Sequence, residues 1–93
     1  MLERQKILLQ IITPEEVLPA EKADMIIMHC TTGDFGVLPG HAPLSALLGR
    51  GAICIYNGGE EEHRITVSGG FAFMQDNVLT VITNEIRPPL PTA

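Results

Sequence analysis

Basic residues are scarce in this sequence. Six Lys and Arg stand against eleven Asp and Glu, which gives a formal net charge of −5. Nucleic acids and anionic lipid surfaces are bound by basic side chains clustered on one face of a protein, whereas the basic residues here are scattered along the chain. We therefore expect no nucleic-acid partner and no binding to anionic lipid.

Long hydrophobic runs and cysteine frameworks are also missing. No apolar stretch approaches the roughly 18 residues that a membrane-spanning helix needs, and no basic segment followed by an apolar run opens the chain. We expect no direct membrane insertion, so that any membrane association goes through another protein. The two cysteines, Cys30 and Cys54, each lie within an apolar run. That setting favours reduced thiols in a reducing compartment over a disulfide framework.

The residue types that could carry chemistry do not fall into catalytic or metal-binding patterns. The candidate metal ligands are three histidines and two cysteines: His29, Cys30, His41, Cys54 and His63. None of them has a C-x-x-C or H-x-x-x-H spacing. Ser45 and Ser68 do not occupy a nucleophile elbow, and the glycine clusters GRG and SGG lack phosphate-loop spacing. We expect neither enzymatic activity nor a metal or cofactor.

Apolar residues are what the chain does contain. They make up 45% of the sequence, while charged residues make up 18%. This composition is too apolar for a disordered chain, and 93 residues suffice for one domain with a single modest core. A surface with so few charges indicates a protein partner.

Apolar and polar residues alternate in several short segments, as in half-buried strands. The segments are residues 6–13, 24–30, 52–56, 63–68, 71–75 and 78–82. Turn signals separate them every eight to twelve residues and no helical pattern stands out, which predicts an all-β sandwich or barrel. A short extended piece is expected at 17–20. The β pattern is lost from Glu85 onward, so we expect a sandwich domain at 1–84 and a proline-rich tail at 85–93.

Three glycine or asparagine pairs predict tight turns. Asn57-Gly58-Gly59 predicts a hairpin with positive φ at Asn57 and Gly58, and the run Glu60–Glu62 is expected to solvate its tip. Asp76-Asn77 predicts a second two-residue hairpin. Gly69 and Gly70, inside a β region, predict a bulge or a close approach of two backbones.

The stretch from residue 33 to 48 predicts a rigid corner between two strands. In Leu38-Pro39-Gly40-His41, proline suits the second position of a type II turn and glycine suits the third, which needs positive φ. Pro43 holds the residue before it extended. His41 is either a hydrogen-bonded structural residue or a ligand or base, and the residue types alone leave both open.

The alternation also predicts the core. We expect most of these side chains to be buried: Ile11, Ile27, Val37, Leu44, Ile53, Ile65, Val67, Phe71, Phe73, Leu79 and Val81. A buried Phe replaced by Ala costs about 3–5 kcal/mol. Phe73→Ala is therefore expected to come close to unfolding the domain.

Two longer stretches resemble the signatures of one family. GDFGVLPGHAPL, residues 33–44, and ITVSGGFAFMQDNVLTVIT, residues 65–83, resemble the epsilon subunit of F-type ATP synthases, called delta in mitochondria. The resemblance implies a flattened two-sheet β-sandwich. It further implies a non-catalytic central-stalk subunit that links the gamma shaft to the membrane c-ring and couples ion-driven rotation to ATP synthesis. Such a subunit lies at the cytoplasmic face of the bacterial inner membrane, or in the organellar equivalent.

The resemblance also implies contact residues. The loop expected to meet the c-ring comprises Thr31, Thr32, Gly33, Asp34 and Phe35. Family members carry a second acidic residue where this chain has Thr32, which makes the expected electrostatic contact weaker. Asp34 has an alternative role as the cap of a Gly33–Gly36 turn. The residues expected to face gamma are His41, Ser45 and Thr13, while Pro39, Gly40, Pro43, Gly69 and Gly70 are expected to shape turns.

One part of the family pattern is not found in this sequence. Family members continue into a helical hairpin that binds ATP or inserts into the catalytic head as a brake, whereas this chain has no C-terminal helical hairpin. We expect it neither to bind ATP nor to inhibit hydrolysis. The alternative function is a free-standing β-sandwich module that binds a small ligand in a pocket under the corner. Copurification with gamma favours the first reading, and capture of a metabolite favours the second.

Overall fold

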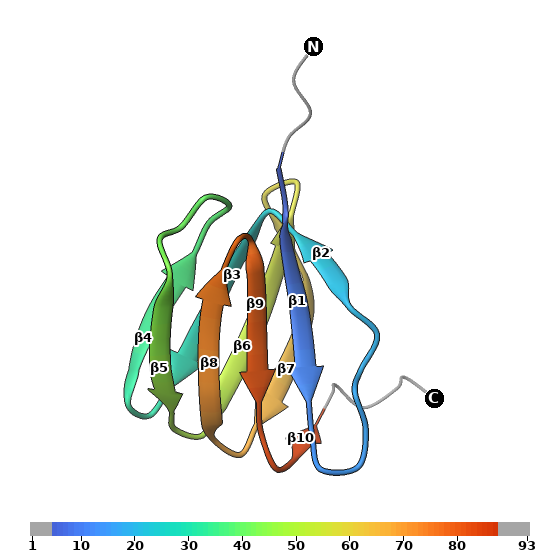
Figure 1. Ribbon diagram of the computed structural model, residues 1–93, viewed down its shortest axis with the longest axis vertical. Coiled ribbons are helices and arrows are strands. Elements are labelled where there is room, and N and C mark those ends of the chain that lie inside the picture. The colour runs from blue at the N-terminus through green and yellow to red at the C-terminus, as the bar shows by residue number, and fades with distance from the viewer. Residues whose placement is uncertain (1–4, 88–93) are drawn as a thin grey trace.

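The structure, a computed structural model, describes residues 5–87, which form ten strands and no helix. The strands make two five-stranded sheets that face each other (Figure 1). The front sheet of Figure 1 has the spatial order β2 (Glu21–Ala23), β1 (Ile7–Ile12), β9 (Val78–Ile82), β8 (Gly70–Gln75) and β5 (Leu44–Leu48). The back sheet has the order β10 (Ile86–Arg87), β7 (Glu60–Val67), β6 (Gly51–Asn57), β3 (Met25–Cys30) and β4 (Gly33–Val37). The expected all-β sandwich is confirmed.

The strands of each sheet pair antiparallel, except that β1 lies parallel to β9. Both β1 and β9 alternate between inward and outward side chains, so their parallel register places Leu9 opposite Leu79 and Ile11 opposite Val81. All four of these side chains are buried. The core therefore continues across a pair of strands that are nearly seventy residues apart in the chain.

The core consists of the inward-facing side chains of both sheets, as period-two alternation requires. The largest fully buried ones are Ile7, Leu9, Met74, Leu79 and Val81 of the front sheet and Ile26, Met28, Val37, Ile53, Ile55 and Val67 of the back sheet. Of the expected core residues, Ile11, Val37, Ile53, Val67, Leu79 and Val81 are buried. Leu44 and Ile65 are half-buried and pack against this core, whereas Ile27 is half-buried on the outer face of the back sheet.

The prediction that the two phenylalanines of β8 face the core was wrong. Phe71 and Phe73 are 38% and 36% exposed, while Ala72 and Met74 are buried. In the sequence Phe-Ala-Phe-Met every residue is apolar, so alternation does not decide which pair faces inward. Side-chain size favoured Phe, but the narrow space between the sheets is filled by the smaller Ala and the flexible Met.

Of the two expected hairpin turns, one differs from expectation and one agrees with it. In the β6–β7 hairpin the positive φ values fall on Gly58 and Gly59, so Asn57 remains in β6, and residues 60–62 belong to β7 and do not form the tip. The β8–β9 turn is as predicted, with φ of 53° at Asp76 and 64° at Asn77. Asn57 leaves the turn because its side chain has another role: it bonds Lys6 and the backbone of Lys22.

The ends of the expected strands also shift. The piece at 17–20 makes only an isolated bridge between Val17 and Ile12, and the regular strand begins at Glu21. The β pattern does not stop at residue 84, because Ile86 and Arg87 form β10 and pair with β7. A two-residue strand is too short to show alternation, which is why it was missed. The prolines of the expected tail lie outside the described residues.

Gly70 marks the close approach that the glycine pair predicted. Its φ is +137°, and a Cβ at this position would overlap the carbonyl oxygen of Ile82 on the neighbouring strand. The hydroxyl of the buried Thr83 donates a hydrogen bond to the carbonyl of Gly69. The start of β8 is thereby held against the end of β9 by backbone contact.

The two faces of β8 predict unequal losses of stability for neighbouring substitutions. Met74→Ala should lower the free energy of unfolding by about 2–5 kcal/mol because it leaves a cavity in the core. Phe73→Ala should cost about 1–2 kcal/mol, since the ring is partly exposed and loses mainly its contact with Phe71, whose centroid lies 6.1 Å away. Urea denaturation measures both, and a larger loss for Phe73 than for Met74 would contradict this assignment of faces.

Candidate functional site

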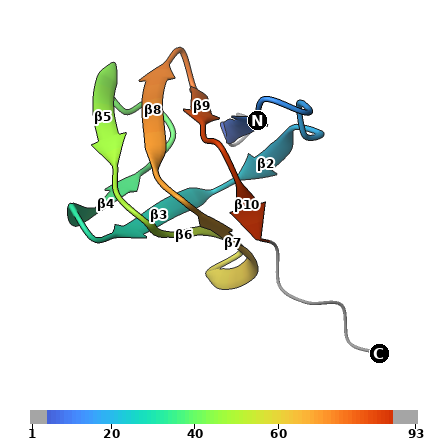
Figure 2. The ribbon, with the colours of Figure 1, turned by 90° about the horizontal axis from the view of Figure 1, so that it is seen from below.

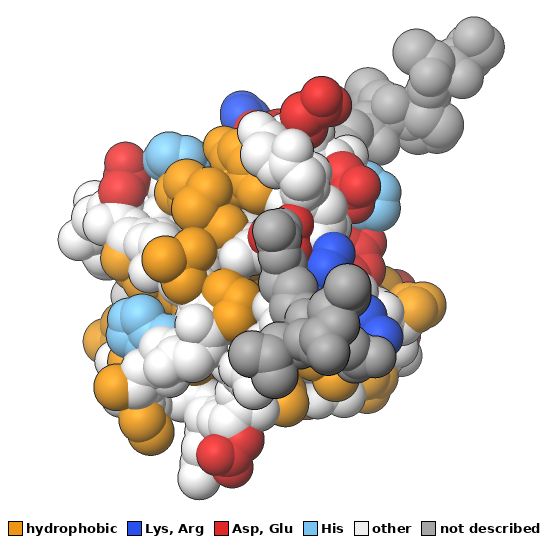
Figure 3. Space-filling view, turned by 90° about the horizontal axis from the view of Figure 1, so that it is seen from above, with side chains coloured by type: hydrophobic (Ala, Val, Ile, Leu, Met, Phe, Trp, Pro, Cys, Tyr) orange, Lys and Arg blue, Asp and Glu red, His pale blue; other side chains and the backbone are white. Residues whose placement is uncertain are grey.

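The loops gather at two opposite ends of the sandwich. The lower end of Figure 1, also seen in Figure 2, consists of residues 13–20, 31–32, 49–50, 68–69 and 83–85. The upper end consists of residues 38–43, 58–59 and 76–77. Acidic side chains line much of the upper end, with hydrophobic ones between them (Figure 3). The upper end therefore presents a mixed acidic and apolar surface.

The loop expected to contact the c-ring lies at the lower end and is tightly held. The hydroxyl of Thr32 accepts a hydrogen bond from the Gly49 amide, with an N–O distance of 3.1 Å, and lies 3.5 Å from the carbonyl oxygen of Leu47. The Thr31 amide donates to the carbonyl of Arg50 at 2.9 Å. The β3–β4 and β5–β6 turns are thus joined and present their exposed residues as one rigid unit.

Asp34 lies within a strand and does not cap a turn. It belongs to β4 and stands opposite His29 of β3, whose Nδ1 lies 3.1 Å from its Oδ2. The alternative of a Gly33–Gly36 cap was therefore wrong. The Asp34 side chain is 63% exposed, so a partner can still reach its carboxylate. Phe35, in contrast, is half-buried and packs against the core, which leaves little of it for a partner.

The corner has the geometry of a type II turn. Gly40 has a φ of +83°, and the His41 amide donates to the Leu38 carbonyl at 3.1 Å. The Gly40 amide donates to Oδ1 of Asn77 at 2.6 Å, which ties the corner to the β8–β9 turn. Nδ1 of His41 lies 2.6 Å from the Ala42 carbonyl oxygen. This contact favours the structural role for His41, although His41 is exposed.

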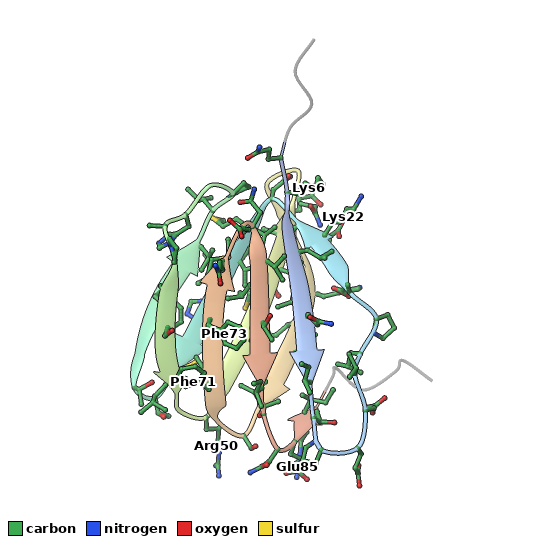
Figure 4. The ribbon with its side chains drawn as sticks, in the orientation of Figure 1. Lys6, Lys22, Arg50, Phe71, Phe73 and Glu85 are labelled. Carbon is green, nitrogen blue, oxygen red and sulfur yellow. The ribbon has the colours of Figure 1, made fainter. Side chains whose placement is uncertain are left out.

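The outer face of the front sheet carries a row of apolar side chains. The strand registers place Leu47, Phe71, Ile82, Ile12 and Val17 side by side across the sheet. Leu47 is 75% exposed and Ile82 is 44% exposed, and Phe71 and Phe73 project from β8 on the same side (Figure 4). We call this row, with Phe73 and Leu8, the apolar face. Monomeric proteins seldom expose contiguous apolar patches larger than a few hundred Å², and larger patches commonly mark binding sites.

Sequence reasoning missed the apolar face because it placed Phe71 and Phe73 in the core. The residues expected to face gamma are spread over the front sheet. Ser45 stands on the outer face beside Phe73, while His41 lies at the upper end. Thr13 lies at the lower end, where its hydroxyl bonds the backbone of Glu16 and shapes the loop after β1.

The other titratable groups of the described residues include two buried thiols and a His–Glu pair between the sheets. Among residues 5–87, no group of three or more His, Cys, Asp or Glu could hold a metal ion. Cys30 and Cys54 are free thiols whose pKa values are raised by burial. Nδ1 of His63 in the back sheet lies 2.6 Å from Oε1 of Glu21 in the front sheet, so this pair joins the two layers. No helix in the described part is long and apolar enough to cross a membrane.

Two facing five-stranded sheets, with apolar side chains exposed on the outer face of one, define the domain as a β-sandwich. The family described as "ATP synthase, Delta/Epsilon chain, beta-sandwich domain" matches residues 6–89, and the chain belongs to that family. The resemblance seen in the two sequence stretches is thereby confirmed.

Curated proteins similar to this chain include ATP synthase epsilon chains. The chain is 41% identical over 76 residues to the ATP synthase epsilon chain of Rhodospirillum rubrum, covering 82% of this chain and 57% of that one. It is 40% identical over 80 residues to that of Granulibacter bethesdensis, covering 86% and 59%. The chain thus spans less than two thirds of the length of these relatives, which are bacterial.

Solved structures agree with the fold. One chain in the structure of the Euglena gracilis mitochondrial ATP synthase, described as OSCP/F1/c-ring, superposes with a TM-score of 0.73 at 31% identity, covering 89% of this chain and 53% of that one. One chain in the Tetrahymena thermophila central stalk and c-ring structure has a TM-score of 0.70 at 13% identity, covering 92% and 69%. The second likeness shows the fold alone.

The buried thiols predict slow alkylation. Because burial raises the pKa of Cys30 and Cys54, less thiolate is present at pH 8 than in an exposed cysteine. Iodoacetamide should modify the folded chain at least ~10-fold more slowly than the urea-unfolded chain. Mass spectrometry of timed samples measures both rates. Equal rates in the two states would show that the thiols are accessible.

Proposed function

We propose that the chain acts as the central-stalk subunit of a bacterial ATP synthase and links the gamma shaft to the c-ring. In this role it is non-catalytic and transmits the torque of ion-driven rotation. It lies at the cytoplasmic face of the membrane and has no direct contact with lipid tails. Its family membership and its likeness to a chain of an F1/c-ring assembly support this role.

The apolar face is the observation that carries the proposal. Leu47, Phe71 and Ile82 lie in one cross-strand row and are substantially exposed. Covering such a row stabilises a complex by about 25 cal/mol for each Å² of apolar area removed from water. Ser45, which was expected to meet gamma, stands in the adjacent row. We assign the apolar face to gamma.

The lower end is assigned to the c-ring. It lies at one end of the sandwich, whereas the apolar face lies along its side (Figures 1 and 2), so one domain can contact a partner at its side and another at its end. Thr31, Thr32, Gly33 and Asp34 are exposed there. Phe35 is left out of this set because its side chain packs against the core.

Rigid surfaces suit a torque-bearing link. The Thr32 hydroxyl bonds the Gly49 amide, and the Asn77 side chain bonds the Gly40 amide, so the loops at both ends are held by side chains from neighbouring turns. Little loop entropy is lost when such surfaces dock. Deformation under load is also small, since the loops move with the sheets.

Leu47→Asp should disrupt binding to gamma. The side chain is 75% exposed, so the domain stays folded, but docking would bury an unpaired carboxylate in an apolar contact. We expect the dissociation constant for purified gamma to rise at least ~10-fold. Leu38→Asp is the matched control, because Leu38 is 56% exposed but lies in the corner turn at the upper end, outside the apolar face. Equal losses for both variants would contradict the assignment.

Asp34→Asn should weaken the association with the c-ring only modestly. An exposed carboxylate paired with a basic loop contributes about 0–1 kcal/mol, so a loss of up to ~5-fold is expected, together with a weaker dependence on salt. Assembly with epsilon-depleted synthase at several salt concentrations measures both. Asp76→Asn, at the upper end, should change neither quantity. An Asp34 variant that assembles with unchanged affinity and salt dependence would remove Asp34 from the contact.

A further inference from the structure

The fold brings together two arginines that are far apart in the sequence. Arg50 and Arg87 line one cavity of about 230 Å³ at the lower end. The cavity is completed by Thr66, Val67, Ser68 and Glu85. Figure 4 places Arg50 and Glu85 at this end, opposite to the end that carries Lys6 and Lys22. The basic residues that look scattered in the sequence are therefore partly clustered in space.

Strand order explains why the two arginines meet. β7 lies between β6 and β10, Arg87 is paired with Thr66 of β7, and Arg50 directly precedes Gly51, which is paired with Val67. Neighbouring strands are about 4.8 Å apart, so the two arginine backbones stand roughly 10 Å apart on either side of the end of β7. Long side chains from both positions can converge on one small group between them.

The donors in this cavity are unused within the described part of the chain. Neither the Arg50 nor the Arg87 guanidinium makes a hydrogen bond or ion pair with residues 5–87, and the same is true of the Thr66 and Ser68 hydroxyls. Arg64, in contrast, is bound to Glu61 with an N–O distance of 3.0 Å. Arg50 and Arg87 are thus free to bind an anion, whereas Arg64 is already neutralised.

We propose that this cavity binds a phosphate group. Each guanidinium offers a planar fork of donors that matches two oxygens of one anion, and two forks with two hydroxyls suit a phosphate better than a two-oxygen carboxylate. The volume lies below the 300–1,000 Å³ typical of pockets for whole small molecules. A phosphate group fits, while a complete nucleotide would extend into solvent.

Glu85 sets the charge preference of the site. Its carboxylate lines the same cavity, and repels a dianion while it can accept a hydrogen bond from a protonated phosphate or from an ammonium group on the ligand. The site therefore carries two positive charges and one negative charge. Nothing in this proposal rests on the rotor role, because it follows from the cavity and its side chains alone.

The test is a titration of the 93-residue chain with inorganic phosphate at constant ionic strength. Binding is monitored through the backbone amide signals in NMR spectra. Saturable shifts are expected for Arg50, Ser68 and Arg87. The double variant Arg50→Ala/Arg87→Ala should weaken binding at least ~10-fold. The control variant Lys22→Ala/Arg64→Ala removes two positive charges from outside the cavity and should bind phosphate like the parent chain. No saturable shift at these residues, or equal losses in both double variants, would overturn the proposal.

Glu85→Gln should change the phosphate affinity in the opposite direction to the arginine variant. Removal of the carboxylate should tighten phosphate binding ~2- to 5-fold, because a like charge leaves the site. Acetate should bind more weakly than phosphate at equal ionic strength. A phosphate affinity that is unchanged or weaker in Glu85→Gln, or acetate binding as tight as phosphate binding, would show that the cavity is not a phosphate site.

Vesicles distinguish the source of the phosphate. If phosphatidylglycerol vesicles bind the chain, and the Arg50→Ala/Arg87→Ala variant alone loses this binding, the ligand is a lipid headgroup. If inorganic phosphate binds but vesicles do not, the ligand is a soluble phosphate compound. Both outcomes support the site, whereas vesicle binding that survives in the Arg50→Ala/Arg87→Ala variant, without phosphate binding in the parent chain, contradicts it.

Discussion

Which side chains of strand β8 face inward determines both the core and the docking surface. Gly70 enters β8 with positive φ, in backbone contact with Ile82, which a side chain at this position would prevent. From that start, alternate residues point inward, so Met74 fills the core and Phe73 faces outward. A shift of one residue would bury the phenylalanines and expose Ala and Met instead. The apolar face exists because the backbone at Gly70 sets this register.

Leaving large apolar side chains outside has a physical cost that a partner can offset. Leu47 is 75% exposed and Ile82 is 44% exposed, so they contribute less to the packing of the isolated domain than the inward-facing side chains of the same strands. The same strands therefore have two functions: one face holds the sheets together and the other is available for docking. Because strand pairing fixes the spacing of the outer row, the docking surface has the rigidity of the core.

Much of the fold could be predicted from the sequence, because local rules decide it. The corner at Gly40 and the turn at Asp76-Asn77 follow from residues that demand particular φ values. The face of β8 could not be predicted, since four consecutive apolar residues satisfy either register. The arginine cavity was also beyond reach, because Arg50 and Arg87 meet only through the order of strands in the back sheet. Local patterns specify turns, while contacts between distant strands depend on topology.

The same distinction explains why the lower end combines several surfaces. The β3–β4 and β5–β6 turns lie side by side there: the Thr31 amide bonds the Arg50 carbonyl, while Arg50 also lines the proposed phosphate cavity. Arg50 thus touches both the loop assigned to the c-ring and the proposed anion site. An anion held by Arg50 and Arg87 would lie beside that loop and would change the charge that a docking partner meets there. Since both surfaces depend on one turn, binding at one is expected to alter binding at the other, and by linkage the effect must be reciprocal.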